Sequence, residues 1–141
     1  MYYFAYGSNM NHEQMSKRCP GSKFIKKTCL AGYKFVYDGY SSTWDGAVAN
    51  IVRDANGKVW GGLFEIDERD LEALNRYEGY PHVYARETLR VRDETDNIYE
   101  ALAYLRKEPQ GIGKPSSEYR DTVIRGAKDC CLDEGYIEKV I

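Results

Sequence analysis

Long apolar stretches are missing from this sequence. After Met1, the longest purely apolar run is Tyr2–Tyr6, whereas a helix that crosses a membrane needs about 20 apolar residues. The amino end also lacks a basic segment followed by an apolar one, which is the pattern of a secretory signal. The sequence therefore predicts a protein that does not enter a membrane and that works in the cytoplasm.

Patterns for metal binding and disulfides are scarce as well. The chain has two histidines, His12 and His82, and neither stands at a spacing typical of metal ligands. Its four cysteines form no Cys-x-x-Cys pair, and Cys130 and Cys131 are direct neighbours, which is a poor arrangement for a mutual disulfide. We therefore expect four reduced thiols and no bound metal.

An excess of charge of one sign is absent too. Twenty Lys and Arg residues nearly balance 22 Asp and Glu residues, which leaves a net charge of −2. Binding to the phosphates of nucleic acid calls for a basic face, so nucleic acid is not an expected partner. With 141 residues, 43% of them apolar, and no repeats or linker-like segments, the chain is expected to fold as one domain spanning residues 1–141.

Apolar and aromatic segments bounded by turn residues predict a strand-rich chain. The expected strands lie at residues 2–6, 24–37, 47–53, 58–66, 83–92 and 98–105. Asn56-Gly57, a pair typical of tight turns, would join the third and fourth strands as a hairpin.

Three helices are predicted, and each begins at a residue type that caps helices: Asn11, Asp67, and Ser116 or Ser117. Gln14 would complete a pair like a capping box with the first cap, and Gly79 would end the second helix. A shorter turn is expected around 136–140. Strands that mostly neighbour one another in sequence favour an α+β fold, with a small, mainly antiparallel β-barrel or sheet of five to six strands flanked by three helices.

The corner Tyr6-Gly7-Ser8-Asn9 is the first place where chemistry could sit. It lies between a predicted strand and a predicted helix, so backbone N–H groups would point outward beside the positive end of the helix dipole. Such a corner can hold a carboxylate or phosphate, although most corners of this type bind nothing. It matches no nucleotide-binding glycine pattern, and Ser8 lacks the Gly-x-Ser-x-Gly elbow. His12 could act as a base but fits a solvated helix residue better.

Glu78 is the second place. It shares one helix face with Leu74 and Leu71, and that face should be buried. It also stands in the last helical turn, where the helix dipole disfavours negative charge. Both effects raise the pKa of this carboxyl toward the value that a general base needs near neutral pH. The alternative is an exposed helix-end glutamate, or one paired with Arg86 or Arg76.

Two separated segments carry a resemblance to a known family. Tyr3-Phe-Ala-Tyr-Gly-Ser-Asn9 and Leu74-Asn-Arg-Tyr-Glu78-Gly79 resemble the signature and the catalytic glutamate of the γ-glutamylcyclotransferase family. Three further segments are similar to the family's later elements, and they are Trp60–Ile66, Tyr84–Arg86 and Pro115–Tyr119. The resemblance covers nearly the whole chain, in order.

The resemblance implies a mixed α/β fold around a β-barrel and an enzyme that cyclises the γ-glutamyl group of a small peptide or amine to 5-oxoproline. Glu78 would be the catalytic residue, acting as base and then as acid. The implied substrate-binding residues are Tyr6, Gly7, Ser8, Asn9 and Tyr119. The partner would be a small γ-glutamyl molecule, no metal or organic cofactor would be needed, and the oligomeric state is left open, with a homodimer as one option.

Two other interpretations stay open at this point. One is a non-catalytic module that binds a small carboxylate or a protein on the same fold. The other is a cyclotransferase for a specific γ-glutamyl amine in a biosynthetic pathway, with the same chemistry and a different leaving amine. Met10 and Tyr80-Pro81 depart from the family's usual residues, and these departures leave the substrate open.

Overall fold

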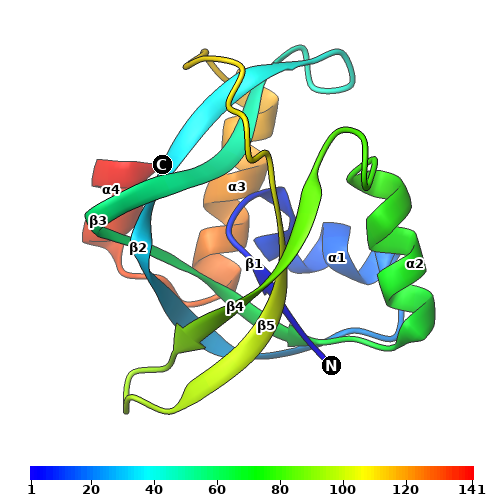
Figure 1. Cartoon of the computed structure of the whole chain (residues 1–141), viewed down its shortest axis with the longest axis vertical. Helices are drawn as coiled ribbons and strands as arrows, with labels where there is room; N and C mark the ends of the chain where they lie inside the picture. The colour runs from blue at the N-terminus through cyan, green and yellow to red at the C-terminus, as the bar shows by residue number, and fades with distance from the viewer.

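A closed barrel of five strands forms the centre of the computed structural model, which describes all 141 residues (Figure 1). The strands are β1 (Tyr2–Ala5), β2 (Lys23–Ser41), β3 (Gly46–Glu65), β4 (Ala85–Arg92) and β5 (Ile98–Leu105). They follow one another around the barrel in the order β1-β3-β2-β4-β5, and only the pair of β1 with β5 is parallel. The predicted α+β fold with a mainly antiparallel barrel is confirmed.

The predicted hairpin at Asn56-Gly57 is wrong, because the strands expected on either side of it are two parts of β3. The ladder between β2 and β3 resumes at once around a bulge, and the flanking pairs are Arg53 with Tyr33 and Lys58 with Ala31. Inside the bulge, the Asp54 side chain accepts a hydrogen bond from the Asn56 N–H at 3.1 Å. This local turn uses the expected chemistry, but pairing with β2 on both sides keeps the strand in line.

Four helices surround the barrel: α1 (His12–Arg18), α2 (Glu68–Tyr77), α3 (Ser117–Asp129) and α4 (Glu134–Val140). The three predicted caps are confirmed, since the side chains of Asn11, Asp67 and Ser116 each accept a backbone N–H bond of their helix. The fourth helix, α4, stands where only a short turn was expected. In Figure 1, α2 lies on the right of the barrel and α4 on the left, with α3 between them.

The short 3-10 helix η1 (Ser8–Met10) connects β1 to α1, and α3 packs directly against it. This close approach depends on Gly126, because a Cβ at that position would lie 2.4 Å from the Asn11 nitrogen and 2.6 Å from the Met10 carbonyl carbon. Thirty-two buried apolar residues form one cluster that fills the barrel and the space under the helices. The core therefore holds η1 between β1 and α3.

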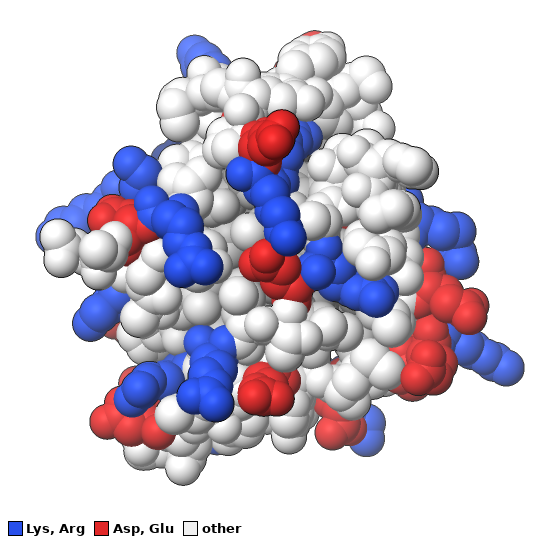
Figure 2. All heavy atoms as spheres, in the orientation of Figure 1, with Lys and Arg blue, Asp and Glu red and all other residues white.

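The surface carries both signs of charge. On the face drawn in Figure 2, Lys and Arg side chains alternate with Asp and Glu side chains, and neither sign forms one continuous patch. None of the four helices is long and apolar enough to cross a membrane.

Substituting Gly126 by Ala should loosen the packing of α3 on η1. Alanine favours a helix over glycine by about 1 kcal/mol, but overpacking against fixed backbone costs about 1–3 kcal/mol, so the free energy of unfolding should fall. Gly135→Ala in α4 is the matched control, since nothing lies within 4 Å of its added Cβ. We expect the control to unfold at equal or higher urea concentration. A Gly126→Ala protein as stable as the wild type would contradict this account.

Candidate active site

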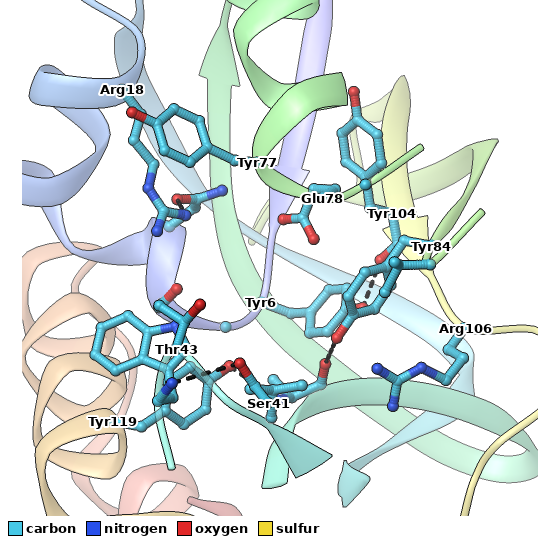
Figure 3. A pocket seen from close by; sticks show the side chains of 18 of the residues that line it. Tyr6, Arg18, Ser41, Thr43, Tyr77, Glu78, Tyr84, Tyr104, Arg106 and Tyr119 are labelled. Atoms are coloured by element: carbon cyan, nitrogen blue, oxygen red, sulfur yellow. Dashed lines mark hydrogen bonds between the residues drawn. The ribbon is translucent and has the colours of Figure 1, made fainter. Parts of the chain in front are cut away.

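One cavity of about 580 Å³ gathers the predicted catalytic and substrate-binding residues (Figure 3). It opens between the end of β1, the end of α2 and the turn that joins β2 to β3. The predicted residues in its wall are Tyr6, Gly7, Ser8, Asn9, Glu78 and Tyr119. Segments that are more than a hundred positions apart in the chain thus meet at one place.

The loop after β1 offers unpaired backbone donors to this cavity. The N–H groups of Gly7, Ser8 and Asn9 donate to no acceptor in the protein, whereas those of Met10 and Asn11 are bonded back into the turn. Successive free N–H groups at such a turn form a concavity that suits an anion. The free N–H groups are present where the sequence predicted them, and the binding of an anion by them stays a prediction.

Glycine is required at position 7 by a close contact. A Cβ there would lie 2.9 Å from the Cβ of Ala49 and 3.4 Å from the hydroxyl of Tyr119. The peptide groups of Ala49 are themselves fixed by two buried tyrosines. The Tyr119 hydroxyl accepts from the Ala49 N–H at 2.9 Å, and the Tyr84 hydroxyl donates to the Ala49 carbonyl at 3.0 Å. The Tyr119 hydroxyl thus keeps its own hydrogen free beside the loop.

The side chains of Ser8 and Asn9 serve the loop itself. Gln14 donates to the Ser8 hydroxyl at 2.9 Å and to the Asn9 side-chain oxygen at 3.0 Å. Asn9 also accepts from Arg18 at 3.1 Å and donates to the Tyr3 hydroxyl at 3.0 Å. The predicted capping-box pair, in which the Gln14 side chain would bond to the cap residue Asn11, is therefore wrong for that side chain. In this part of the loop, the backbone N–H groups are left free for a ligand.

The Tyr6 side chain is likewise engaged with the protein. Its hydroxyl donates to the carbonyl of Tyr104 on β5, and burial raises the pKa of Tyr6 well above its usual range. Tyr6 therefore contributes its buried ring to the cavity wall, with its only hydroxyl hydrogen already donated.

Glu78 caps the end of α2 and stands half-buried in the cavity wall. Leu74, on the same helix face, is fully buried, as the spacing predicted. The Glu78 carboxylate makes no hydrogen bond or ion pair with the protein, so pairing with Arg76 or Arg86 is wrong. Arg86 instead donates to the Asn75 side chain at 3.0 Å. Burial raises the pKa of Glu78 to about 7, and the positive charge of Arg18 acts in the opposite direction.

Several residues of the site were not found from the sequence. The Arg18 guanidinium lies 4.4 Å from the centre of the Tyr77 ring and is tied to the loop through Asn9. Trp44, in the turn between β2 and β3, packs edge-on against Tyr119 with ring centres 5.0 Å apart. No local motif marks these positions. Arg18 follows Lys17 at the end of α1, and Trp44 stands out only as a large aromatic residue in a polar turn.

His12 lies outside the cavity, and it is half-buried where the sequence favoured a solvated residue. Its ring packs on Phe24 and Phe64, with ring centres 4.8 and 5.8 Å apart. No three His, Cys, Asp or Glu side chains gather closely enough to hold a metal ion. The cavity therefore combines a loop of unpaired backbone N–H groups with one carboxyl whose pKa is raised to about 7 by burial. Such a pair can fix a small acid and move a proton on it.

Known proteins of one family are similar to this chain in sequence and in fold. The family model described as gamma-glutamyl cyclotransferase, AIG2-like, matches residues 3–121. Gamma-glutamylcyclotransferases of Mus musculus and Homo sapiens are 27% and 28% identical over 143 residues, which cover 98% of this chain and 76% of each relative. A solved structure named gamma-glutamyl cyclotransferase is similar with a TM-score of 0.93 at 27% identity, covering 99% of this chain and 85% of the other.

The raised pKa of Glu78 makes a prediction for stability. The folded protein binds this proton more tightly than the unfolded chain, so stability should fall as the pH rises from about 4.5 to about 7. Glutamine stays neutral throughout. Glu78→Gln should therefore be more stable than the wild type at about pH 8, and the gap should close at about pH 4. Urea unfolding at the two pH values measures the difference in stability, and the exposed Glu72→Gln on the same helix is the control. Equal stability of the wild type and Glu78→Gln at every pH would refute the shift.

Proposed function

The chain belongs to the gamma-glutamyl cyclotransferase, AIG2-like family, and we propose that it cyclises the γ-glutamyl group of a small γ-glutamyl amino acid or amine. The products are 5-oxoproline and the released amine. The observation that carries the proposal is the position of Glu78, a carboxyl without a protein partner, in the same cavity as the unpaired N–H groups of the Gly7–Asn9 loop.

The loop binds the α-carboxylate of the glutamyl group. The free N–H groups of Gly7, Ser8 and Asn9 donate to its oxygens, and the free hydrogen of the Tyr119 hydroxyl is available beside them. The reaction joins two ends of one molecule, so holding a folded conformer with the amine next to the γ-carbonyl supplies much of the rate enhancement. Fixing the α-carboxylate while Glu78 stands over the amine does this.

Glu78 then moves protons. The α-ammonium of a γ-glutamyl group is protonated near neutral pH and cannot attack a carbonyl. The Glu78 carboxylate accepts one proton, the freed nitrogen attacks its own γ-carbonyl carbon, and a new C–N bond closes a five-membered ring. The protonated Glu78 gives its proton to the leaving nitrogen, and the original C–N bond breaks. Over the whole cycle, two protons pass from the α-nitrogen to the leaving nitrogen, so the products balance the substrate without water or a cofactor.

The pKa of Glu78 suits both halves of this cycle. A carboxyl with a pKa of about 7 is strong enough as a base to accept the ammonium proton and strong enough as an acid to return it. A surface glutamate with its ordinary pKa would be a much weaker base. The burial that raises the pKa therefore supports the catalytic role.

A non-catalytic module that binds a small carboxylate is the competing function. Such a module gains nothing from Glu78, because an unpaired negative charge in the cavity repels an anionic ligand and costs stability. Retention of this residue beside the anion-binding loop supports the enzyme. The identity of the leaving amine depends on the cavity residues outside the Gly7–Asn9 loop and Glu78.

Glu78→Gln tests the catalytic role. The amide keeps the size of the side chain and cannot accept the ammonium proton, so turnover should fall by at least about 10²–10⁴-fold, the usual contribution of a general base. Release of 5-oxoproline from a panel of γ-glutamyl amino acids and amines is the measurement, with Glu72→Gln as a control that keeps normal turnover. Near-normal turnover by a folded Glu78→Gln protein would exclude this mechanism.

The proton-transfer scheme also predicts that activity needs no metal. Release of 5-oxoproline should be unchanged after dialysis against a strong chelator, compared with the same protein dialysed without it. Activity that disappears with chelator and returns with an added divalent metal would contradict the scheme.

A further inference from the structure

Arg106 is a buried arginine in the cavity wall that the scheme above does not use. It follows the last residue of β5, only 8% of its surface is exposed, and it lines the same cavity as Glu78. An arginine is rarely buried unless its charge is compensated.

Asp38 on β2 compensates the charge and holds the side chain in place. One terminal nitrogen of Arg106, Nη1, donates to the Asp38 carboxylate at 2.9 Å. The same carboxylate accepts the N–H groups of Gln110 and Gly111, each at 2.8 Å. The Arg106 backbone is fixed as well, since its N–H donates to the Asn50 side chain at 2.9 Å. The guanidinium is therefore anchored at one nitrogen.

The remaining nitrogens of this guanidinium have no partner in the protein. The Nε atom is buried and makes no hydrogen bond, and the second terminal nitrogen, Nη2, makes none either. A buried donor without an acceptor is costly, and more so when it is charged. Three of the five N–H groups of Arg106 are thus open, on a side chain that Asp38 prevents from swinging out to solvent.

The guanidinium end of Arg106 reaches the cavity from the side away from Arg18. In Figure 3, the guanidinium of Arg106 reaches in from the right, Arg18 lies on the left, and Glu78 lies between them. The Tyr84 ring covers the flat face of the guanidinium, 5.1 Å from its carbon. Burial and the charge of Glu78 both raise the pKa of Tyr84, whereas Arg106 lowers it, so Tyr84 lies within reach of both charges.

The cavity wall carries three arginines, Arg18, Arg76 and Arg106, and one acid, Glu78. Asp38 offsets the charge of Arg106, which leaves one more positive than negative charge around the cavity and so favours an anionic substrate. The loop takes the α-carboxylate of the glutamyl group under the proposed function. A planar guanidinium with adjacent free N–H groups is the preferred partner of a second carboxylate, which it can bind through two parallel bonds.

Resting on the proposed function, we propose that Arg106 binds a carboxylate on the leaving amine and thereby selects γ-glutamyl amino acids over γ-glutamyl amines that lack a negative group. Asp38 is the positioning residue that holds the guanidinium for this contact. The leaving nitrogen stays near Glu78, and the rest of the leaving group extends past Tyr84 toward Arg106.

The test compares γ-glutamyl-alanine with γ-glutamyl-alaninamide, which differ only in that carboxylate. The measured quantity is the ratio of their kcat/KM values for 5-oxoproline release. The wild type should prefer the acid, and Arg106→Gln should lower the ratio by about 10–100-fold, the range for losing a hydrogen bond to a charged group. Arg106→Lys keeps the ion pair with Asp38 but loses the planar fork, so its ratio should be intermediate.

Exposed Arg90→Gln on β4 changes the net charge equally and lies outside the cavity, so its ratio should match the wild type. A merely structural effect of an Arg106 substitution lowers kcat/KM for both compounds together and leaves the ratio unchanged, which would overturn the inference. If Arg106→Gln fails to fold, the ratio of Arg106→Lys decides in the same way. Equal use of both compounds by the wild type would overturn the inference alone, whereas no 5-oxoproline from either would overturn the proposed function.

Discussion

Keeping one carboxyl without a partner inside a cavity is the constraint on which the site depends. Glu78 has no ion pair and no hydrogen bond within the protein, and burial raises its pKa to about 7. Such a group opposes folding whenever it is charged, so the surrounding structure has to hold it there. Leu74 anchors its helix face in the core, and Gly79, with a φ of +63°, ends the helix directly after it. Arg18 moderates the pKa from across the cavity.

The loop opposite Glu78 is held in place by its own polar side chains. These side chains form hydrogen bonds with Gln14, Arg18 and Tyr3, which tie the loop to α1 and to the core. Its backbone N–H groups are what remains unpaired. Because the free donors belong to the backbone, a substitution in the loop does not remove them directly, although any side chain at Gly7 would meet Ala49. The specificity of the cavity must therefore come from its other walls.

Local signals in the sequence predicted the elements, and the family resemblance predicted which of them meet. The caps at Asn11 and Asp67 and the buried face of α2 follow from spacing alone. The hairpin at Asn56-Gly57 is wrong because a local turn preference lost to pairing with β2 on both sides. Arg106 and Arg18 could not be identified, since a single arginine after a strand or at the end of a helix has no periodicity or motif. Their environment is made by residues far away in the chain, such as Asp38.

The parallel pairing of β1 with β5 has a consequence for how the chain acquires this site. The first strand to be synthesised lies between β3 and β5 in the closed barrel, so it lacks one neighbour until residue 105 has been made. The helix that makes the most contacts with the loop after β1 is α3, which begins only at Ser117. Contacts between such distant segments form slowly because a long loop must close first. The Gly7–Asn9 loop therefore lacks both the strand that completes the barrel beside β1 and the helix that packs on it until most of the chain has been made.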